Sequence, residues 1–211
     1  RYLRALDMPL SEIKDFLQNR DIDRVEEKLR QQKRAVLQKQ RELRRIQRKI
    51  DHRLNWLADA ETAPLNTVSL VRLPACRVVW MDDPLRIDGS ADMEAPIRKL
   101  DQSDAEAVVF LGKVGLGISA ERLRRAETAL YDGIFLLLDQ EDLYTGETLR
   151  LPETLCARLR FRGSHREAQP RYQTLLRYID QHSLRITGFS REITLIDYGV
   201  TSDPDKFVTE I

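Results

Sequence analysis

Glycine and proline are scarce in the first third of the sequence. All nine glycines lie at or after Gly89, and Pro9 and Pro64 are the only prolines in the first 73 residues. Because these two residue types most often end or kink a helix, nothing interrupts a long helix between the two prolines. The sequence therefore predicts a helix over 21–59 and a short polar hinge over 60–66.

Cysteine, histidine and long apolar runs are also scarce. The two cysteines, Cys76 and Cys156, lie far apart in strand-like segments, which is typical of reduced core residues rather than of a disulfide or a metal pair. The three histidines are dispersed, and metal ligation needs clustering. No apolar run approaches the ~18 residues that cross a bilayer, and residues 1–20 lack the pattern of a signal peptide. We expect a cytoplasmic protein with no metal, no cofactor and no membrane partner.

Charge is unevenly distributed along the chain. Residues 24–53 contain 12 Lys and Arg against 4 Asp and Glu, whereas residues 54–211 contain 19 against 25. A basic helix joined to an acidic domain indicates separate roles. The acidic excess would suit a cationic ligand, although surface acid also serves solubility. We interpret the basic excess as a solvated helix face.

Apolar residues recur at heptad spacing within the predicted helix. One row contains Leu29, Val36, Leu43, Ile50 and Leu57, and the other contains Val25 and Ile46 but also Gln32, Lys39 and Arg53. The offsets alternate between four and three, as in a coiled coil. The polar second row favours an antiparallel partner or packing against another domain. We predict dimerisation through Leu29, Val36, Leu43, Ile46, Ile50 and Leu57; the alternative is an amphipathic helix of a globular bundle.

After the hinge the periodicity changes to that of strands. The first half of 67–211 shows strand patterns at 68–71, 76–80, 107–111 and 134–138 and a helix pattern at 92–102. The second half shows strand patterns at 156–162, 191–197 and 206–211 and a helix pattern at 172–182. Two βαββ halves in one domain predict an antiparallel sheet with a ligand cleft between them.

The N-terminal segment carries a family resemblance. Residues 2–17, YLRALDMPLSEIKDFL, followed by the heptad helix, resemble the second half of the winged helix-turn-helix domain of MerR-family transcriptional regulators. The resemblance implies that 1–20 is the C-terminal part of that DNA-binding domain and that 21–59 pairs antiparallel in a homodimer. The recognition helix that reads the major groove is missing, and the chain begins at Arg1 in mid-pattern. We therefore expect promoter DNA and RNA polymerase to be partners of a longer parent protein.

The C-terminal segment resembles a second family. The matching stretches are VRLPA at 71–75, FRGSH at 161–165, REI at 191–193 and TEI at 209–211, which are similar to the GyrI-like, or AraC-type, effector-binding domain. The order of the two families is that of BmrR-type multidrug-sensing activators. The resemblance implies a ligand-responsive transcriptional regulator that binds a small hydrophobic, cationic effector and alters promoter DNA as a homodimer.

Together these features predict an α+β chain. It comprises the remnant of a helical DNA-binding domain, a long dimerising coiled-coil helix, and a C-terminal antiparallel sheet domain of two βαββ halves.

Glu192 is the first candidate for effector binding. It begins an otherwise apolar strand, where alternation places Glu192, Thr194 and Ile196 on one face. The resemblance implies that this acid lies at the floor of a pocket and meets cationic ligands, since a carboxylate among aromatic rings attracts a lipophilic cation. A surface strand glutamate is the alternative. The aromatic residues expected to line the pocket are Trp80, Tyr131, Phe135, Phe161, Tyr172 and Phe207.

Two further motifs indicate no chemistry. The segment GKVGLG at 112–117 departs from the dinucleotide fingerprint, and we predict that its glycines permit close approach to a strand. Ser164 and His165 are adjacent, but no orienting acid can be placed beside them from the sequence. We therefore predict no catalytic residues and no enzyme, with a GyrI-like small-molecule hydrolase or a drug-sequestering module as alternatives.

Overall fold

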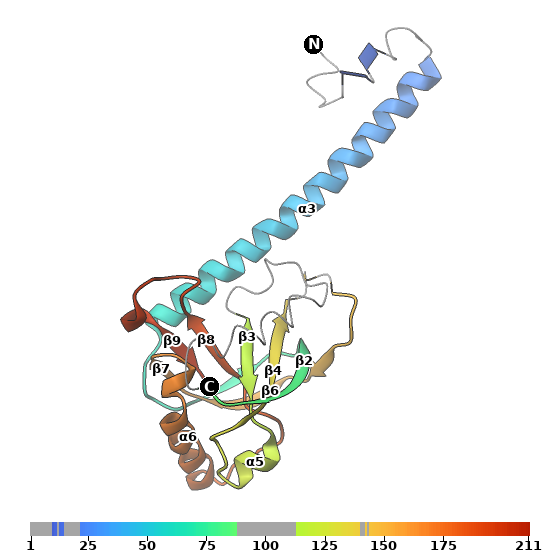
Figure 1. The fold of residues 1–211 in the computed structure, drawn as a ribbon. Helices are drawn as coiled ribbons and strands as arrows, with labels where there is room; N and C mark the ends of the chain where they lie inside the picture. The colour runs from blue at the N-terminus through green and yellow to red at the C-terminus, as the bar shows by residue number, and fades with distance from the viewer. Residues whose placement is uncertain (1–9, 12, 15–21, 88–112, 140–141, 143) are drawn as a thin grey trace. The chain divides into compact units, whose positions relative to one another are not determined.

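The computed structural model describes residues 10–11, 13–14, 22–87, 113–139, 142 and 144–211 (Figure 1). The chain divides into two compact units, Arg1–Arg53 and Leu54–Ile211. The predicted helix over 92–102 and strand over 107–111 lie outside the described residues, as does most of 1–20. Among the described helices, none combines the length and the hydropathy that crossing a membrane requires.

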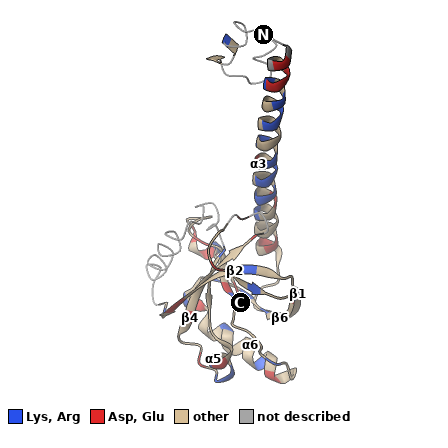
Figure 2. Cartoon of the chain, turned by 90° about the vertical axis from the view of Figure 1, so that its right-hand side faces the viewer, with Lys and Arg blue, Asp and Glu red and all other residues tan. Residues whose placement is uncertain are grey.

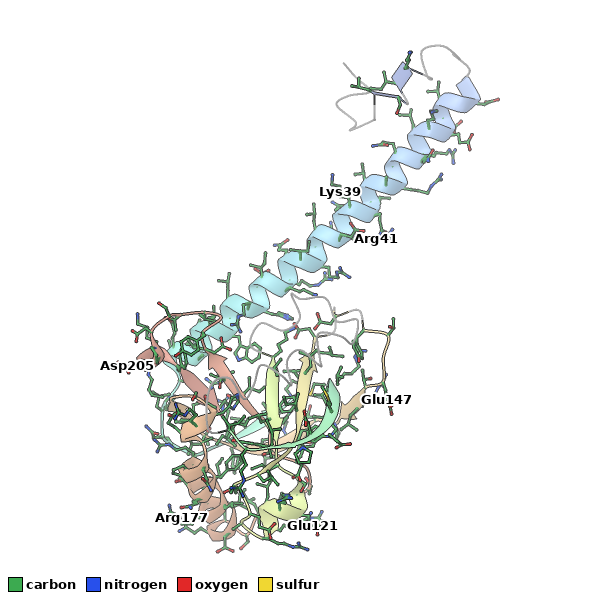
Figure 3. All side chains as sticks on the ribbon, in the orientation of Figure 1. Lys39, Arg41, Glu121, Glu147, Arg177 and Asp205 are labelled. Atoms are coloured by element: carbon green, nitrogen blue, oxygen red, sulfur yellow. The ribbon has the colours of Figure 1, made fainter. Side chains whose placement is uncertain are left out.

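The predicted long helix is α3, Ile22–Thr62. It extends three residues into the predicted hinge and ends before Pro64, where the Thr62 hydroxyl donates to the carbonyl of Ala58 at 2.8 Å. Pairs four residues apart support its surface, as when Gln38 donates to Glu42 at 2.9 Å. Figure 2 shows the Lys and Arg positions of α3 in blue along its ribbon, and Figure 3 shows the side chains of Lys39 and Arg41 as sticks on it.

Strands and short helices form the second unit. Its elements are β1 (Ser69–Leu73), β2 (Cys76–Leu85), β3 (Val114–Gly117), α5 (Ala120–Arg124), β4 (Tyr131–Leu138), β5 (Leu149–Leu151), β6 (Thr154–Arg158), β7 (Arg160–Arg162), the 3₁₀ turn η3 (His165–Glu167), α6 (Gln169–Gln181), β8 (Glu192–Ile196), the 3₁₀ turn η4 (Pro204–Lys206) and β9 (Val208–Glu210). Within the described residues, one sheet has the order β5-β2-β4-β3-β8-β9-β7, and β1 pairs with β6 separately. All pairings are antiparallel, which confirms the predicted α+β class.

The two halves of the sheet meet between β3 and β8. Only two residue pairs join these strands in register, Gly115 with Ile193 and Leu116 with Glu192. The larger ladders lie on either side, β2 with β4 in the first half and β8 with β9 in the second. The first residue of β8 therefore lies on the seam between the halves.

The predicted strand over 156–162 is wrong in one respect, because it is two strands. β6 pairs with β1, whereas β7 pairs with β9 in the larger sheet. The break falls at Leu159, which is buried and exchanges backbone hydrogen bonds with Ile211 at 3.0 and 2.9 Å. The last predicted strand, 206–211, shortens to β9 because Pro204 begins the 3₁₀ turn η4.

Apolar clusters cover both faces of the sheet. One cluster contains Leu123 of α5, Leu175 of α6 and strand residues such as Leu136. The other contains Ala60 from the last turn of α3 together with Phe135. Because neighbouring residues of a strand point to opposite faces, Phe135 and Leu136 pack on different sides. The strands are consequently rich in apolar residues on both faces, as sheets covered on both sides require.

The last turn of α3 is tied to the sheet by Arg160, the first residue of β7. Its guanidinium is buried, donates to Glu210 of β9 at 2.6 Å, and donates to the carbonyl of Asp59 at 2.9 Å. It also pairs with the Asp59 carboxylate. The end of α3 is therefore fixed to the two strands that follow β8 in the sheet.

Candidate functional site

The site centres on the carboxylate of Glu192, which has no exposed surface. The hydroxyl of Tyr131 lies 3.0 Å from its Oε1 and 2.8 Å from its Oε2. Nδ1 of His165 lies 2.6 Å from Oε1. A buried carboxylate is costly unless donors satisfy it, and these two side chains provide them. The site thus combines an acid, a phenol and an imidazole within a closed core.

Local structure explains how three distant segments meet. Glu192 begins β8 beside Leu116 of β3, and Tyr131 begins β4, the other neighbour of β3. His165 is the first residue of η3, which is fixed by a reciprocal capping box: the Ser164 hydroxyl accepts from the Arg166 amide, and the Glu167 carboxylate accepts from the Ser164 amide. The site is therefore built on two strands and one capped turn.

Tyr172 closes the site from α6. It is 2% exposed, and its hydroxyl lies 2.9 Å from the Ser190 hydroxyl. The Ser190 side chain accepts from the Ile118 amide at 2.9 Å, and its amide donates to the Ile118 carbonyl at 2.8 Å. Tyr172 is thus fixed to the chain that leads into β8.

Both phenols remain protonated. Burial raises the pKa of Tyr131 far above its ordinary value, and the charge and hydrogen bond of Glu192 raise it further. Burial also raises the pKa of Tyr172 well above its ordinary value, and the charges of Glu192 and Tyr131 raise it further. A phenol that keeps its proton is a donor. Tyr131 therefore acts as a neutral hydrogen-bond donor to the carboxylate.

The structure separates the predicted effector-binding residues into groups. Tyr131, Phe161 and Tyr172 share the core cluster on the side to which Glu192 is bonded. On the other face, Trp80 and Phe135 pack around Phe189, with ring centroids 4.6 and 6.0 Å from it. Phe207 packs edge-on against Tyr198 at 4.8 Å.

Alternation along β8 holds only for its first residues. Glu192 and Thr194 lie on the face away from Ile193, but Ile196 packs in the same cluster as Ile193 and Leu195. The register between β8 and β9 shifts between Thr194 and Ile196. A local irregularity of this kind re-aims the following side chains, so the prediction that Ile196 shares a face with Glu192 is wrong.

His165 and Ser190 belong to the site but were not among the predicted residues. The acid that orients His165 is Glu192, 27 residues later in the sequence, so the sequence neighbourhood of His165 does not reveal it. Ser164 makes no pair with His165, because its hydroxyl donates to Glu167 at 2.9 Å. The only sequence signal for His165 is its place in the FRGSH stretch.

The glycines of β3 confirm the predicted close approach. A Cβ on Gly115 would overlap the ring of Phe135 and lie 2.6 Å from the backbone oxygen of Glu192. A Cβ on Gly117 would lie 2.6 Å from the ring of Trp80. These glycines let aromatic rings lie against the sheet beside the seam. Gly112, the first glycine of the motif, lies outside the described residues.

The two cysteines lie on either side of one arginine. Both Cys76 and Cys156 are free, and their sulfurs accept from the same guanidinium, that of Arg191, at 3.7 and 3.3 Å. Over the described part of the chain, no group of three His, Cys, Asp or Glu side chains is placed to hold a metal ion.

The predicted dimerisation residues differ in exposure. Four of them are between 49% and 60% exposed, namely Val36, Leu43, Ile46 and Ile50. Leu29 is half-buried. Leu57, near the end of α3, packs against the core cluster that contains Phe135. The side chain of Leu57 is thus engaged within its own domain.

Comparison with known proteins places this geometry in a family. The model of the GyrI-like small molecule binding domain matches residues 66–211, more than half of the chain. The chain belongs to the GyrI-like family. A search of curated proteins found no match. The buried Glu192 and its partners therefore lie within a GyrI-like small-molecule binding domain.

A solved structure shares its fold, and two others are more distantly similar. A chain of the EcmrR–DNA complex in EcmrR-RPo is 15% identical with a TM-score of 0.53, covering 99% of this GyrI-like protein and 78% of that chain. The EcmrR C-terminal domain is 11% identical with a TM-score of 0.48, and the match covers 68% of this protein and 93% of that chain. SAV2435, solved bound to tetraphenylphosphonium, is 16% identical with a TM-score of 0.39, and the match covers 69% of this protein and 91% of that chain. Identities this low concern the fold alone.

Proposed function

We propose that this GyrI-like protein is a ligand-responsive transcriptional regulator whose effector is a small hydrophobic cation bound at Glu192. The observation that carries the proposal is the Glu192 carboxylate, fully buried beside the phenols of Tyr131 and Tyr172. A lipophilic cation loses little hydration on entering an apolar site and gains both the carboxylate and the aromatic faces. Membership in a family of small-molecule binding domains supports this reading.

We further propose that the protein acts on promoter DNA and RNA polymerase as a cytoplasmic homodimer. The fold likeness that spans 99% of the chain is to EcmrR, a protein solved in complex with DNA. Leu43 and Ile50 of α3 offer an exposed apolar row for a second copy. The chain itself would serve binding and signalling rather than turnover.

The signal would travel through contacts already in place. Glu192 lies on β8, β8 pairs with β9, and Glu210 of β9 holds Arg160, which in turn holds Asp59 in α3. A ligand that displaces the start of β8 would alter the support of the last turn of α3. Such coupling requires that the ligand bind one arrangement more tightly than the other.

The test is a calorimetric titration with tetraphenylphosphonium and with the neutral triphenylphosphine oxide. We expect micromolar binding of the cation and a loss of at least about tenfold in Glu192→Gln, since a charged contact in a buried site contributes roughly 1.5–3 kcal/mol. Glu153→Gln is the control, because Glu153 is an exposed carboxylate paired with Arg72. If only the neutral compound binds, or if Glu192→Gln binds the cation equally well, the proposal should be withdrawn.

A second candidate function is hydrolysis of a small molecule. One observation favours it: the His165 imidazole lies 2.6 Å from the Glu192 carboxylate, and a carboxylate that orients an imidazole is a common element of general-base catalysis. Release of nitrophenol from a nitrophenyl ester, lost in both His165→Asn and Glu192→Gln, would support this function. A drug-sequestering module would instead bind the cation equally well after removal of residues 1–53.

A further inference from the structure

The acid proposed to receive a cationic effector already has a basic neighbour. Nδ1 of His165 lies 2.6 Å from Oε1 of Glu192, and the two side chains are 10% and 0% exposed. An ionised carboxylate only accepts hydrogen bonds, so Nδ1 must donate, and the pair is strongest when the imidazole carries a full charge. His165 therefore occupies the place that an external cation needs.

We propose that His165 is the resident counter-ion of Glu192 and that a cationic effector binds by displacing it. The inference rests on the function proposed above and identifies the residue that sets the site's preference. Neutral ligands gain nothing from removing the imidazole. A permanent cation replaces it on the carboxylate, and the two positive charges cannot share one buried acid without repulsion.

The described groups around Glu192 indicate that His165 is the residue that can act as its counter-ion. Tyr131 from β4 and Tyr172 from α6 are neutral phenols. On η3 itself, Arg166 and Glu167 are exposed, and Glu167 is engaged by Ser164. Among the described side chains that hydrogen-bond Glu192, the imidazole is the one that can carry a positive charge.

The positive charge of Arg171, at the start of α6, has a partner other than Glu192. Its guanidinium lies over the ring of Phe161, 5.6 Å from the centroid. It therefore binds an aromatic face and not the carboxylate.

The position of His165 also makes it the more easily displaced partner. It lies on a three-residue turn, and only its ring nitrogen contacts Glu192. Rotation of the side chain would leave the backbone bonds of the turn intact, because Ser164 and Glu167 hold those. Tyr131, in contrast, begins a strand that pairs on both edges.

Displacement has a thermodynamic signature. Imidazole in water ordinarily loses its positive charge between pH 5 and 8, so a cation that expels a charged imidazole into water releases a proton near neutral pH, but not at pH 5.5. The affinity for the cation should then rise with pH, by up to tenfold per pH unit when one proton is released. A neutral ligand should show neither effect.

The experiment is calorimetry with tetraphenylphosphonium at pH 5.5, 7.0 and 8.5, in two buffers that differ in ionisation enthalpy. The whole chain is compared with His165→Asn and His182→Asn. His182 is the matched control, because it is exposed and bonds a backbone carbonyl at 2.8 Å. We expect the wild type and His182→Asn to bind the cation more tightly at pH 8.5 than at 5.5, and to release a proton on binding at pH 7.0. His165→Asn should bind with little pH dependence and no such release.

The outcomes separate the two proposals. Cation binding without pH dependence or proton release in the wild type would overturn the counter-ion role and leave the proposed function standing. The same conclusion follows if His165→Asn keeps the full pH dependence. Absence of cation binding in every protein at every pH would remove the proposed function and this inference with it. The wild-type proton release gives a result even if His165→Asn does not fold.

Discussion

A single phenolic hydrogen serves both oxygens of the buried acid. The Tyr131 hydroxyl lies within hydrogen-bond distance of Oε1 and Oε2 of Glu192, and burial holds its pKa far above the ordinary value. An unfolded tyrosine ionises near pH 10. Above that pH the folded chain binds more protons than the unfolded chain, so stability is complete below about pH 10 and falls as pH rises further.

Alkaline titration of tyrosine absorbance should therefore resolve a delayed group. Of the six tyrosines, Tyr131 and Tyr172 should ionise only when the chain unfolds, as followed in parallel by circular dichroism. Tyr131→Phe should remove about half of the delayed amplitude and reduce stability at pH 7 by roughly 1–2 kcal/mol, because the acid loses a donor. Tyr198→Phe, at a 64% exposed position, should leave the delayed amplitude unchanged. An unchanged amplitude in Tyr131→Phe would contradict the assignment.

At the scale of single residues, the sequence predicts some residues of the Glu192 site. It misses the others for physical reasons. Glu192, Tyr131 and Tyr172 were predicted, because an acid heading an apolar strand and aromatics within strands or helices carry local signals. His165 was missed because its partner, Glu192, is distant from it in the sequence. The pairing of β8 in the sheet brings the two side chains together. Trp80 and Phe135 pack on the opposite face, since the face of an aromatic depends on strand register, which composition does not fix.

Among the elements, one ion-paired arginine fastens the end of α3 to the sheet, in addition to the apolar packing of Leu57 and Ala60. Arg160 is 4% exposed and joins Asp59 of α3 to Glu210 of β9. The hydrogen bond from Arg160 lowers the pKa of Asp59. The stabilisation from Asp59 is therefore present above the unfolded value of about 4 and is lost as pH falls below it.

Arg160→Met should lower the free energy of unfolding by about 1–3 kcal/mol at pH 7, since it removes a buried guanidinium that both carboxylates share and leaves Glu210 only its longer pair with Arg158 at 3.6 Å. Urea unfolding measures the loss. Arg72→Met is the control, because Arg72 and Glu153 form an exposed pair of 67% and 58% exposure that should contribute less than about 1 kcal/mol. Equal losses in the two variants would show that the Arg160 cluster does not fasten the helix.

Most elements follow from local patterns, and the exceptions follow from tertiary pairing. The absence of glycine and proline predicted α3, and α6 matches the predicted helix apart from its start at Gln169, beside Pro170. The division between β6 and β7 could not be predicted, because Leu159 continues the strand-like alternation of apolar residues with Arg158, Arg160 and Arg162. Its role as a break depends on its bonds with Ile211 at the chain's last position.

For the whole molecule, the exposed row of α3 is the feature that calls for a partner. Leu43 is 60% exposed and Ile50 is 54% exposed, one heptad apart on the same face. Apolar surface arranged at this spacing is typical of helices that pair. The order of a basic helix before an acidic sheet domain was predictable from charge alone. The identity of the partner was not, because the seam contains polar residues.

Light scattering coupled to gel filtration should find a dimer for the wild type at micromolar concentration. The double substitution Leu43→Gln and Ile50→Gln should give a monomer whose sheet domain remains folded, because both positions are exposed within the chain. The matched control is Arg34→Gln with Arg41→Gln, also exposed and one heptad apart, which should stay dimeric. A wild-type monomer would contradict the homodimer.

The narrow seam between β3 and β8 also has a kinetic consequence. Glu192 has no exposed surface, and only two residue pairs join its strand to the other half of the sheet. A ligand therefore reaches the acid only when the protein opens, and the short ladder between β3 and β8 is held by these two pairs and by the hydrogen bond from the Ser190 amide to the Ile118 carbonyl. Association would then be gated by the protein's own opening rate and not by diffusion. Ligands of different size would enter at similar rates, and selectivity among them would arise in how slowly each one leaves.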